Sequence, residues 1–385
     1  MKDLIKEKIR LALTESAIRM KFHIDIPSDI LDIKNVFVEN GYKLYIVGGA
    51  VRDAILGKTP KDFDLATNAI PDKVEAIMNK AGFKTLPTGK AFGVINVFTD
   101  RGEYEIATFR TDIGSGRRPD AVEFTTIDND VKRRDLTINA LFYDIETGEV
   151  VDLVGGINDL KNGIIRTVGE PADRFGEDRL RILRAIRFAA RFGVELDPAV
   201  DAALKNDASL EGISGERIRD EFIKGIKSAK SVKQFLGLID KYGLFDWIFR
   251  GLRVNNDFLE ERDPILVIST LLVGNDPNVV GKQLNALKYT IDETRAIVFL
   301  LSLLRLSPET AVQLKRMQKN SGVNDGQINR FGGHQNINSS LLKAFINFKL
   351  SVSGEELMQR FGLKQGKELG DAINKAEYDN FQKLL

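Results

Sequence analysis

Apolar and polar residues alternate differently in the two parts of this chain. In the first part, short apolar runs such as 43–47, 94–98 and 103–109 lie between turn residues, a pattern typical of strands. Segments such as 29–40 place apolar residues three and four positions apart, which indicates amphipathic helices. From residue 174 onwards the helical spacing dominates. The pattern predicts an α+β head followed by an elongated, mostly helical body.

The length of the chain predicts more than one domain. A single hydrophobic core stops growing at roughly 250–300 residues, and this chain has 385. Residues 1–27 form a polar segment that we expect to be a helical lead-in, and residues 28–165 carry the mixed pattern of strands and helices. The glycine pair at 155–156 marks the change to the helical region.

Composition excludes several kinds of site. The sequence contains no cysteine, so disulfides and thiolate zinc sites are excluded. His23 and His334 lie far apart and lack metal-ligand spacing. The charged N-terminus does not fit a signal peptide, and the apolar stretches near 265–273 and 296–304 are shorter than the roughly 20 residues that span a bilayer. We expect a soluble, cytoplasmic protein with no membrane partner.

The net charge of +1 conceals local basic clusters. Residues 132–134 read Lys-Arg-Arg, and a series of arginines occupies 174–191. Such patches can bind phosphate groups while acidic surface elsewhere cancels the total charge. A nucleotide or nucleic-acid partner therefore remains compatible with the balanced composition.

One segment joins a glycine turn to two carboxylates. Residues 48–53 read Gly-Gly-Ala-Val-Arg-Asp after an apolar run, and Gly48 and Gly49 are candidate nucleotide-binding residues because glycine lets the backbone approach a bulky anion. On a strand, Asp62 and Asp64 would point to one face and residue 63 to the core. Paired carboxylates suit Mg²⁺, which takes one or two of them together with substrate phosphates and water.

Each element also has a simpler interpretation. An isolated Asp-x-Asp is usually a solvated turn, and so is a glycine pair. Here both fall within one short segment, in the order that metal-dependent nucleotidyl transfer requires, which favours the site. Residues 57–59 read Gly-Lys-Thr, like the end of a P-loop, but that motif needs glycine at position 52, where this chain has arginine. We therefore exclude a P-loop.

Glu105 is a candidate third acidic residue of the site. In the predicted strand 103–109, odd-numbered residues share one face. Two-metal phosphoryl chemistry commonly uses a further carboxylate, so Glu105 is a candidate catalytic residue. The alternative is an exposed carboxylate of a hairpin whose turn is 99–102.

The segment 133–140 pairs arginines with a carboxylate and an amide. Arginine can hold phosphate oxygens through two parallel hydrogen bonds, which makes Arg134 a candidate phosphate ligand. Asp135 and Asn139 are four residues apart, so on a helix they would share a face and join the nucleotide site. The alternative is a helix start whose charges contact solvent.

A further segment, 177–188, places charged residues at helical spacing. Asp178, Arg181, Arg184 and Arg187 recur every three residues and would form one slowly turning polar stripe. The alternative is a bundle helix with a solvated arginine stripe. A row of like charges repels itself, however, and an anionic ligand would relieve that repulsion. Asp178 and Arg181 together could also pair with the edge of a base.

Taken in order, these motifs resemble the class II tRNA nucleotidyltransferases, the bacterial and eukaryotic CCA-adding enzymes, whose catalytic head is shared with bacterial poly(A) polymerase. The resemblance is carried by residues 48–53 with 62–64, by Arg-Arg-Asp at 133–135 and by Glu-Asp-x-x-Arg at 177–181. Residues 151–160 resemble the connector from head to neck, and 214–219 resemble a further neck motif. The match is ordered over about 40–230.

The resemblance implies a polymerase-β-like nucleotidyltransferase head of α+β fold, followed by an elongated all-α neck, body and tail. The expected division is a lead-in at 1–27, a head at 28–165, a neck with the nucleotide-selecting helix at 166–230, a body at 231–325 and a tRNA-binding tail at 326–385. The implied assignments are two Mg²⁺ ions at Asp62 and Asp64, triphosphate at Gly49, Arg52 and Arg134, base selection at Asp178 and Arg181, and nucleotide or primer phosphate at Arg184 and Arg187.

The implied reaction is attack by the tRNA 3′-hydroxyl on the α-phosphate of CTP or ATP, with release of pyrophosphate. The tRNA partner would be held by its acceptor arm, through duplex shape and backbone. A poly(A) polymerase, or an enzyme limited to CC or to A addition, is the alternative; the loop at 110–119 resembles the flexible loop that accompanies the switch from C to A. A non-catalytic RNA-binding relative is a further alternative. The presence of both Asp62 and Asp64 argues against it.

Overall fold

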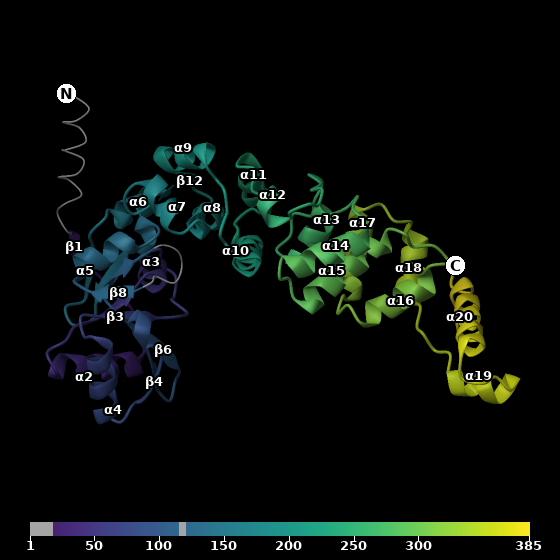
Figure 1. Ribbon diagram of the computed structural model, residues 1–385, viewed down its shortest axis with the longest axis horizontal. Coiled ribbons are helices and arrows are strands. Elements are labelled where there is room, and N and C mark those ends of the chain that lie inside the picture. Colours follow the sequence, from purple (N-terminus) through teal and green to yellow (C-terminus); the bar gives the residue numbers. More distant parts are fainter. Residues whose placement is uncertain (1–17, 115–120) are drawn as a thin grey trace. The chain divides into compact units, whose positions relative to one another are not determined.

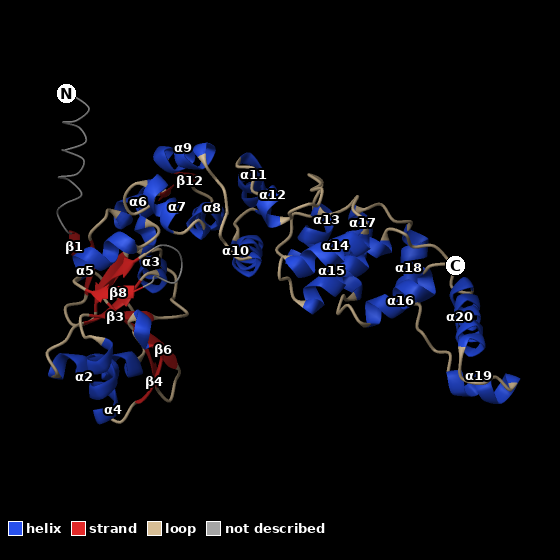
Figure 2. Cartoon of the chain, in the orientation of Figure 1, coloured by secondary structure: helices blue, strands red, loops and turns tan. Residues whose placement is uncertain are grey.

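The computed structural model describes residues 18–114 and 121–385. The chain forms two compact units, which divide between residues 212 and 213 (Figure 1). All strands of the described residues belong to the first unit, and the second is built from helices, as the colouring of Figure 2 shows. The predicted α+β head followed by helices is confirmed.

The first unit contains an eight-stranded mixed sheet. In spatial order its strands are Ile18–Lys21 (β1), Glu149–Asp152 (β10), Leu141–Asp144 (β9), Leu44–Val47 (β2), Asp64–Thr67 (β3), Glu103–Thr108 (β6), Val94–Phe98 (β5) and Lys84–Gly89 (β4). Only β3 and β6 pair in parallel; the other neighbours are antiparallel. A tight turn joins β5 to β6, where the Thr99 amide donates to the Gly102 carbonyl at 2.8 Å.

Alternating side chains give the sheet two buried faces. One face carries Ile46, Leu65 and Ile106 and packs against the apolar sides of Ser28–Glu39 (α2) and Pro71–Lys80 (α4). The opposite face carries a second apolar cluster that includes Tyr45, Ala66, Phe109 and Phe142. Strand side chains alternate between the two faces of a sheet. The polar residues at the strand ends therefore also point to one face or the other.

Short helices connect the strands and complete the first unit. They are Gly49–Ile55 (α3), Ile127–Asp130 (α5), Gly156–Asn162 (α6), Pro171–Glu177 (α7), Leu180–Phe192 (α8) and Pro198–Asn206 (α9), with 3₁₀ turns at Lys90–Phe92 (η1), Val131–Arg133 (η2) and Thr137–Asn139 (η3). Two small ribbons, Arg110–Ile113 (β7) with Ala121–Phe124 (β8) and Ile164–Ile165 (β11) with Glu195–Leu196 (β12), lie outside the main sheet.

The second unit consists of helices around its own apolar core. They are Gly215–Ser228 (α10), Val232–Lys241 (α11), Phe245–Ile248 (α12), Pro264–Leu271 (α13), Pro277–Ala286 (α14), Ile291–Leu303 (α15), Ala311–Lys319 (α16), Asp325–His334 (α17), Ser339–Asn347 (α18), Gly354–Phe361 (α19) and Lys367–Gln382 (α20). Phe299, Phe331 and Phe345 are fully buried in that core. Capping boxes at Thr290 and Asn324 fix the starts of α15 and α17. In each, the N-cap side chain accepts from the backbone amide three residues on, and that residue's side chain accepts from the N-cap amide.

Several sequence expectations need correction. Residues 18–27 contain a strand and no helix, while 1–17 lie outside the described residues. The loop expected at 110–119 begins as strand β7, because Arg110–Ile113 pairs with β8; residues 115–120 lie outside the described residues. The expected four-part division of 28–385 stays a prediction. Within 18–114 and 121–385, no helix combines the length and the apolar character needed to cross a bilayer.

Candidate active site

The glycine turn ends strand β2 and starts helix α3. Gly48 has φ +67°, a conformation that side chains with a Cβ rarely adopt, so glycine is required there by the backbone. Gly49 is the first residue of α3 and has space for a Cβ, with the Arg52 Nη2 atom 3.5 Å away. The turn follows the end of β2, beside the start of β3.

Arg52 lies beneath this turn and is only 3% exposed. It donates to Asp53 at 2.8–2.9 Å and to the side-chain oxygen of Asn139, and it faces the rings of Phe188 and Phe192 at 5.1 and 5.4 Å. Burial, above all, lowers its pKa, and the charge of Asp53 opposes that shift. Sequence reasoning placed Arg52 on the triphosphate; in this structure its donors hold the turn to its surroundings.

The carboxylates of Asp62 and Asp64 have no hydrogen bond or ion pair within the described residues. Asp64 is the first residue of β3, opposite Val47, and shares a strand face with Ala66 of the second apolar cluster. Asp62 precedes the strand, a correction to the predicted strand at 62–65. Phe63 packs against the other core, as predicted. Desolvation by the surrounding protein raises the pKa of Asp64. The positive charge of Arg134 opposes this shift, and the negative charge of Asp62 adds to it.

Glu105 lies on the neighbouring strand. The parallel register pairs Leu65 with Ile106 and Ala66 with Ala107, so one step back along both strands sets Asp64 beside Glu105. In the part of the chain that the structure describes, however, no group of three or more His, Cys, Asp and Glu side chains is close enough to hold a metal ion. Glu105 therefore shares the face of Asp64 without completing a three-carboxylate cluster.

Arg134 approaches the carboxylates over the sheet. Its guanidinium lies 4.5 Å from the ring of Phe142, which pairs with Val47, the residue opposite Asp64. Asp130, only 1% exposed, holds it through a contact of 3.1 Å and also binds Arg133 at 2.7 Å. Burial would raise the pKa of Asp130, but the two arginines outweigh it and hold the pKa below its usual value. Arg134 is thus fixed beside the acidic pair.

A chain of polar contacts links the glycine turn to helix α8. Arg52 donates to Asn139, whose amide donates to Asp135 at 3.5 Å, and Asp135 accepts from Arg184 at 2.6 Å. Although burial alone would raise the pKa of Asp135, the charge and hydrogen bonds of Arg184 lower it below the usual value. Residues 137–139 form a 3₁₀ turn rather than an α-helix, yet Asp135 and Asn139 still meet as predicted.

The arginine stripe starts at an elbow between two helices. Asp178 is the C-cap of α7 and accepts from the Leu180 amide at 3.1 Å. The prediction that Asp178 shares one continuous helix with the arginines is therefore wrong, because α8 begins only at Leu180. Arg181 lies in the first turn of α8 and donates to Glu177 at 2.6 Å and to the Arg133 carbonyl at 2.8 Å. Arg187 is 8% exposed and lies 4.3 Å from the ring of Phe188.

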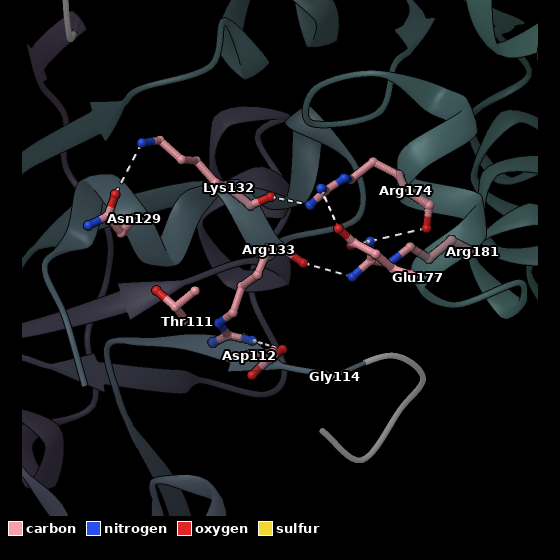
Figure 3. A pocket seen from close by; sticks show the side chains of 9 residues that line it. All are labelled: Thr111, Asp112, Gly114, Asn129, Lys132, Arg133, Arg174, Glu177 and Arg181. Carbon is pink, nitrogen blue, oxygen red and sulfur yellow. Dashed lines mark hydrogen bonds and ion pairs between the residues drawn. The ribbon is translucent and has the colours of Figure 1, made fainter. Parts of the chain in front are cut away.

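A cavity of about 210 Å³ opens beside this elbow. Figure 3 shows its lining, to which ribbon β7, helix α5, turn η2 and the α7–α8 elbow contribute, namely Thr111, Asp112, Gly114, Asn129, Lys132, Arg133, Arg174, Glu177 and Arg181. Of the residues predicted for the site, only Arg181 lines the cavity; the acidic pair and the glycine turn do not.

Sequence reasoning missed three residues that position the site. Asp130 holds both Arg133 and Arg134; its spacing of three and four residues from them on a short helix was the available signal. Asp53 bridges Arg52 and Arg191, with the second contact at 3.3 Å. Phe188 lies against Arg52. The last two depend on contacts between α3 and α8 that no local pattern reveals.

Two segments of the chain match known protein families. Residues 44–166 match the family described as "Poly A polymerase head domain", and residues 193–255 match "Probable RNA and SrmB- binding site of polymerase A". The chain is 35% identical over 367 residues to the CCA-adding enzyme of Ligilactobacillus salivarius, covering 88% of each chain. It is 33% identical over 273 residues to Poly(A) polymerase I of Haemophilus influenzae, covering 67% of this chain and 59% of that protein.

The fold agrees with these sequence matches. The crystal structure of the Bacillus stearothermophilus CCA-adding enzyme in complex with CTP superimposes with a TM-score of 0.73 at 29% identity, covering 92% of this chain and 93% of that one. The fold and the site define a nucleotidyltransferase. The chain belongs to the family of the CCA-adding enzymes. The family predicted from the motifs is thus confirmed.

Proposed function

We propose that this protein adds or repairs the 3′-terminal CCA of tRNA, using CTP and ATP, without a nucleic-acid template. The observation that supports this best is the pair Asp62 and Asp64, which lacks internal partners in the described residues and lies at the sheet end where the glycine turn and Arg134 meet. A relative identical at 35% over 88% of both chains is a CCA-adding enzyme. The tRNA 3′-hydroxyl would attack the α-phosphate and release pyrophosphate.

The acidic pair fits divalent metal. Desolvation by the surrounding protein, above all, raises the pKa of Asp64, and the neighbouring charge of Asp62 adds to the cost of ionising it. Mg²⁺ commonly binds one or two carboxylates and completes its shell with substrate phosphates and water. Asp62 and Asp64 would hold two Mg²⁺ ions, and the chemistry that such ions supply is a lower pKa of the attacking hydroxyl and neutralisation of charge on the departing pyrophosphate.

The remaining residues would position the triphosphate. The backbone at Gly48 and Gly49 would approach the phosphates, and Arg134 would reach them from the side of Phe142. Asp135 and Asn139 would hold the glycine turn and Arg184 in fixed positions relative to each other. Arg187 would add positive charge next to them. Arg52 is predicted to reach the triphosphate as well, which requires it to exchange Asn139 for a phosphate oxygen. Glu105, next to Asp64 on the neighbouring strand, would be the third acidic residue of the site.

Base selection is assigned to the elbow. Asp178 offers acceptor atoms and Arg181 offers donor atoms, a combination that can pair with the polar edge of cytosine or adenine. Arg181 is held by Glu177 and by the Arg133 carbonyl, so its direction is fixed before a base arrives. Preorganised donors discriminate best because a mismatched partner leaves buried polar groups unpaired.

The function is tested with tRNA that lacks its terminal CCA. Incubation with labelled CTP and ATP, singly and together, should give two cytidines with CTP alone, completed CCA with both, and no extension with ATP alone. Long adenosine tails from ATP alone would instead identify a poly(A) polymerase, and absence of any incorporation would leave an RNA-binding relative.

Arg181→Ala sharpens the test of base selection. We expect the CTP-to-ATP selectivity, measured as a ratio of kcat/KM values on tRNA ending in its discriminator base, to fall about tenfold or more, because one base-edge hydrogen bond to a charged group contributes roughly 1.5–3 kcal/mol. The KM for triphosphate should change less. Arg179→Ala is the matched control, since Arg179 binds Asp207 and Ser209 on another side. Unchanged selectivity would remove Arg181 from base recognition.

A further inference from the structure

The cavity of Figure 3 carries more positive charge than its own carboxylates neutralise. Three carboxylates in and directly behind the cavity wall form, with their arginines and Lys132, one charged cluster. Each of these carboxylates is shared between two arginines: Asp130 by Arg133 and Arg134, Asp112 by Arg110 and Arg133, and Glu177 by Arg174 and Arg181. Lys132 adds a further cation, and its ammonium contacts only the Asn129 side chain, at 3.1 Å, within the described residues. The cations of this cluster thus outnumber its carboxylates.

The crowded cations repel one another. The pKa of Arg110 is lowered mainly by burial and, second, by the positive charge of Arg133. The pKa of Arg134 is likewise lowered, mainly by burial, with Arg133 contributing. Two backbone carbonyls fix the arrangement, because Arg174 donates to the Lys132 carbonyl at 2.5 Å and Arg181 to the Arg133 carbonyl at 2.8 Å. A fixed cluster with excess positive charge around an open space is suited to an anion.

We propose that this cavity binds a backbone phosphate of the RNA strand that is being extended, an inference that rests on the proposed function for the identity of that RNA. The cavity of about 210 Å³ is far larger than the roughly 10–15 Å³ that one water needs, so it has room for a phosphate group. Lys132 and Arg174 provide the donors, and Glu177 and Asp112 stay turned to their arginines.

A phosphate here would belong to the RNA and not to the incoming triphosphate. The triphosphate is assigned to the glycine turn and to the acidic pair, and none of these residues lines the cavity. Arg181 lines it and is also the proposed base-reading residue, so the cavity adjoins the position of the incoming base. A nucleotide that precedes the attacking 3′ end would therefore extend into the cavity while the 3′-terminal nucleotide faces the new base.

Lys132 is the position at which to test this site. Its side chain is exposed and outside the assigned catalytic residues, and the Lys132→Ala change keeps the backbone carbonyl that Arg174 uses. Lys73→Ala, at an exposed lysine of helix α4, is the matched control. The primary measurement is equilibrium binding of the full-length protein to tRNA lacking CCA, without triphosphate or metal, over a range of salt concentrations.

One phosphate contact to single-stranded RNA contributes about 0.7 to the slope of log affinity against log salt. Lys132→Ala should therefore lower the slope by about 0.7 and weaken binding about fivefold at 0.1 M salt, and Lys132→Glu roughly twentyfold, while Lys73 variants match the parent protein. The KM for tRNA should rise in parallel, and neither the KM for CTP nor inhibition by pyrophosphate should change.

Unchanged tRNA affinity and salt slope in both Lys132 variants would overturn the proposal. A rise in the KM for CTP, or weaker inhibition by pyrophosphate, with normal tRNA affinity would assign the bound phosphate to the mononucleotide and refute the RNA assignment. Because binding is measured without catalysis, a protein that binds tRNA through Lys132 but adds no nucleotides would refute the proposed function and leave the phosphate site intact.

Discussion

The two units differ in what they bury. The first unit buries charged side chains beside its apolar cores, and within the described residues these are Asp29, Arg52, Asp130, Asp144, Asp152, Asp159, Arg187 and Asp197. In the helical unit the buried charged side chains are Glu221 and Glu377, amid a core rich in phenylalanine. Burying charge costs free energy unless each group is paired. The difference therefore marks the unit whose interior is organised to hold arginines in fixed directions.

Glu377 illustrates the contrast. Its carboxylate accepts from the Ser351 and Val352 amides at 2.7 and 2.6 Å, so it fastens the segment between α18 and α19. Asp130, in the first unit, instead fixes two guanidinium groups, one of which lies beside the acidic pair. Both carboxylates are buried, and each accepts hydrogen bonds. One stabilises a chain segment, and the other orients charge toward a site.

The largest expected effect comes from the acidic pair. Asp64→Ala should reduce nucleotide incorporation about a thousandfold, because several kcal/mol of transition-state stabilisation would be lost and each 1.36 kcal/mol is a factor of ten. Asp72→Ala, at an exposed carboxylate of α4, is the control. Incorporation within tenfold of the parent protein would contradict the assignment.

The same residue gives a prediction for pH. The folded state raises the pKa of Asp64, so ionisation costs stability once the pH exceeds the unfolded pKa, and the full cost is present above the folded pKa. Asp64→Asn should therefore raise the melting temperature slightly at pH 7 in the presence of a chelator, and the gain should vanish toward pH 3. A variant less stable than the parent at pH 7 would show a structural role.

In the helical unit we expect stability to change without chemistry. Phe345→Ala removes a fully buried ring and should lower the free energy of unfolding by about 3–5 kcal/mol. Phe361→Ala, at a ring that is 60% exposed, should change it by less than about 0.5 kcal/mol. Hydrogen exchange should show the loss of protection confined to residues 213–385, and KM for CTP should be unchanged. Loss of protection in the head would break the comparison.

A smaller loss is expected where the head buries charge. Asp130→Asn keeps the shape but removes the buried negative charge that Arg133 and Arg134 share, which should cost about 2 kcal/mol at pH 7. The pKa of Asp130 is depressed in the folded state, so its contribution is present above the unfolded pKa and disappears as the pH falls through the folded value. Urea unfolding at pH 7 and pH 3 checks this: the difference from the parent should shrink at the lower pH. A constant difference would exclude the charge as its cause.

Much of the architecture could be predicted from sequence because local patterns specify it. Strand Val94–Phe98 was predicted at its observed bounds, and helix α2 within one residue at each end, since their apolar spacing agrees with their burial. Predictions failed where partners are distant in sequence. Ile18–Lys21 is a strand because it pairs with β10, and Arg110–Ile113 because it pairs with β8.

The sequence by itself determined the family, the order of motifs and the residues that carry charge, because these are properties of residue type and spacing. The tertiary structure decided what those charges face. It turned Arg52 inward onto Asn139 and the phenylalanines of α8, broke the expected stripe at Asp178, and gathered Lys132 and Arg174 around one cavity. The physical reason is that electrostatic contacts depend on distance and burial, which only the packing of remote segments establishes.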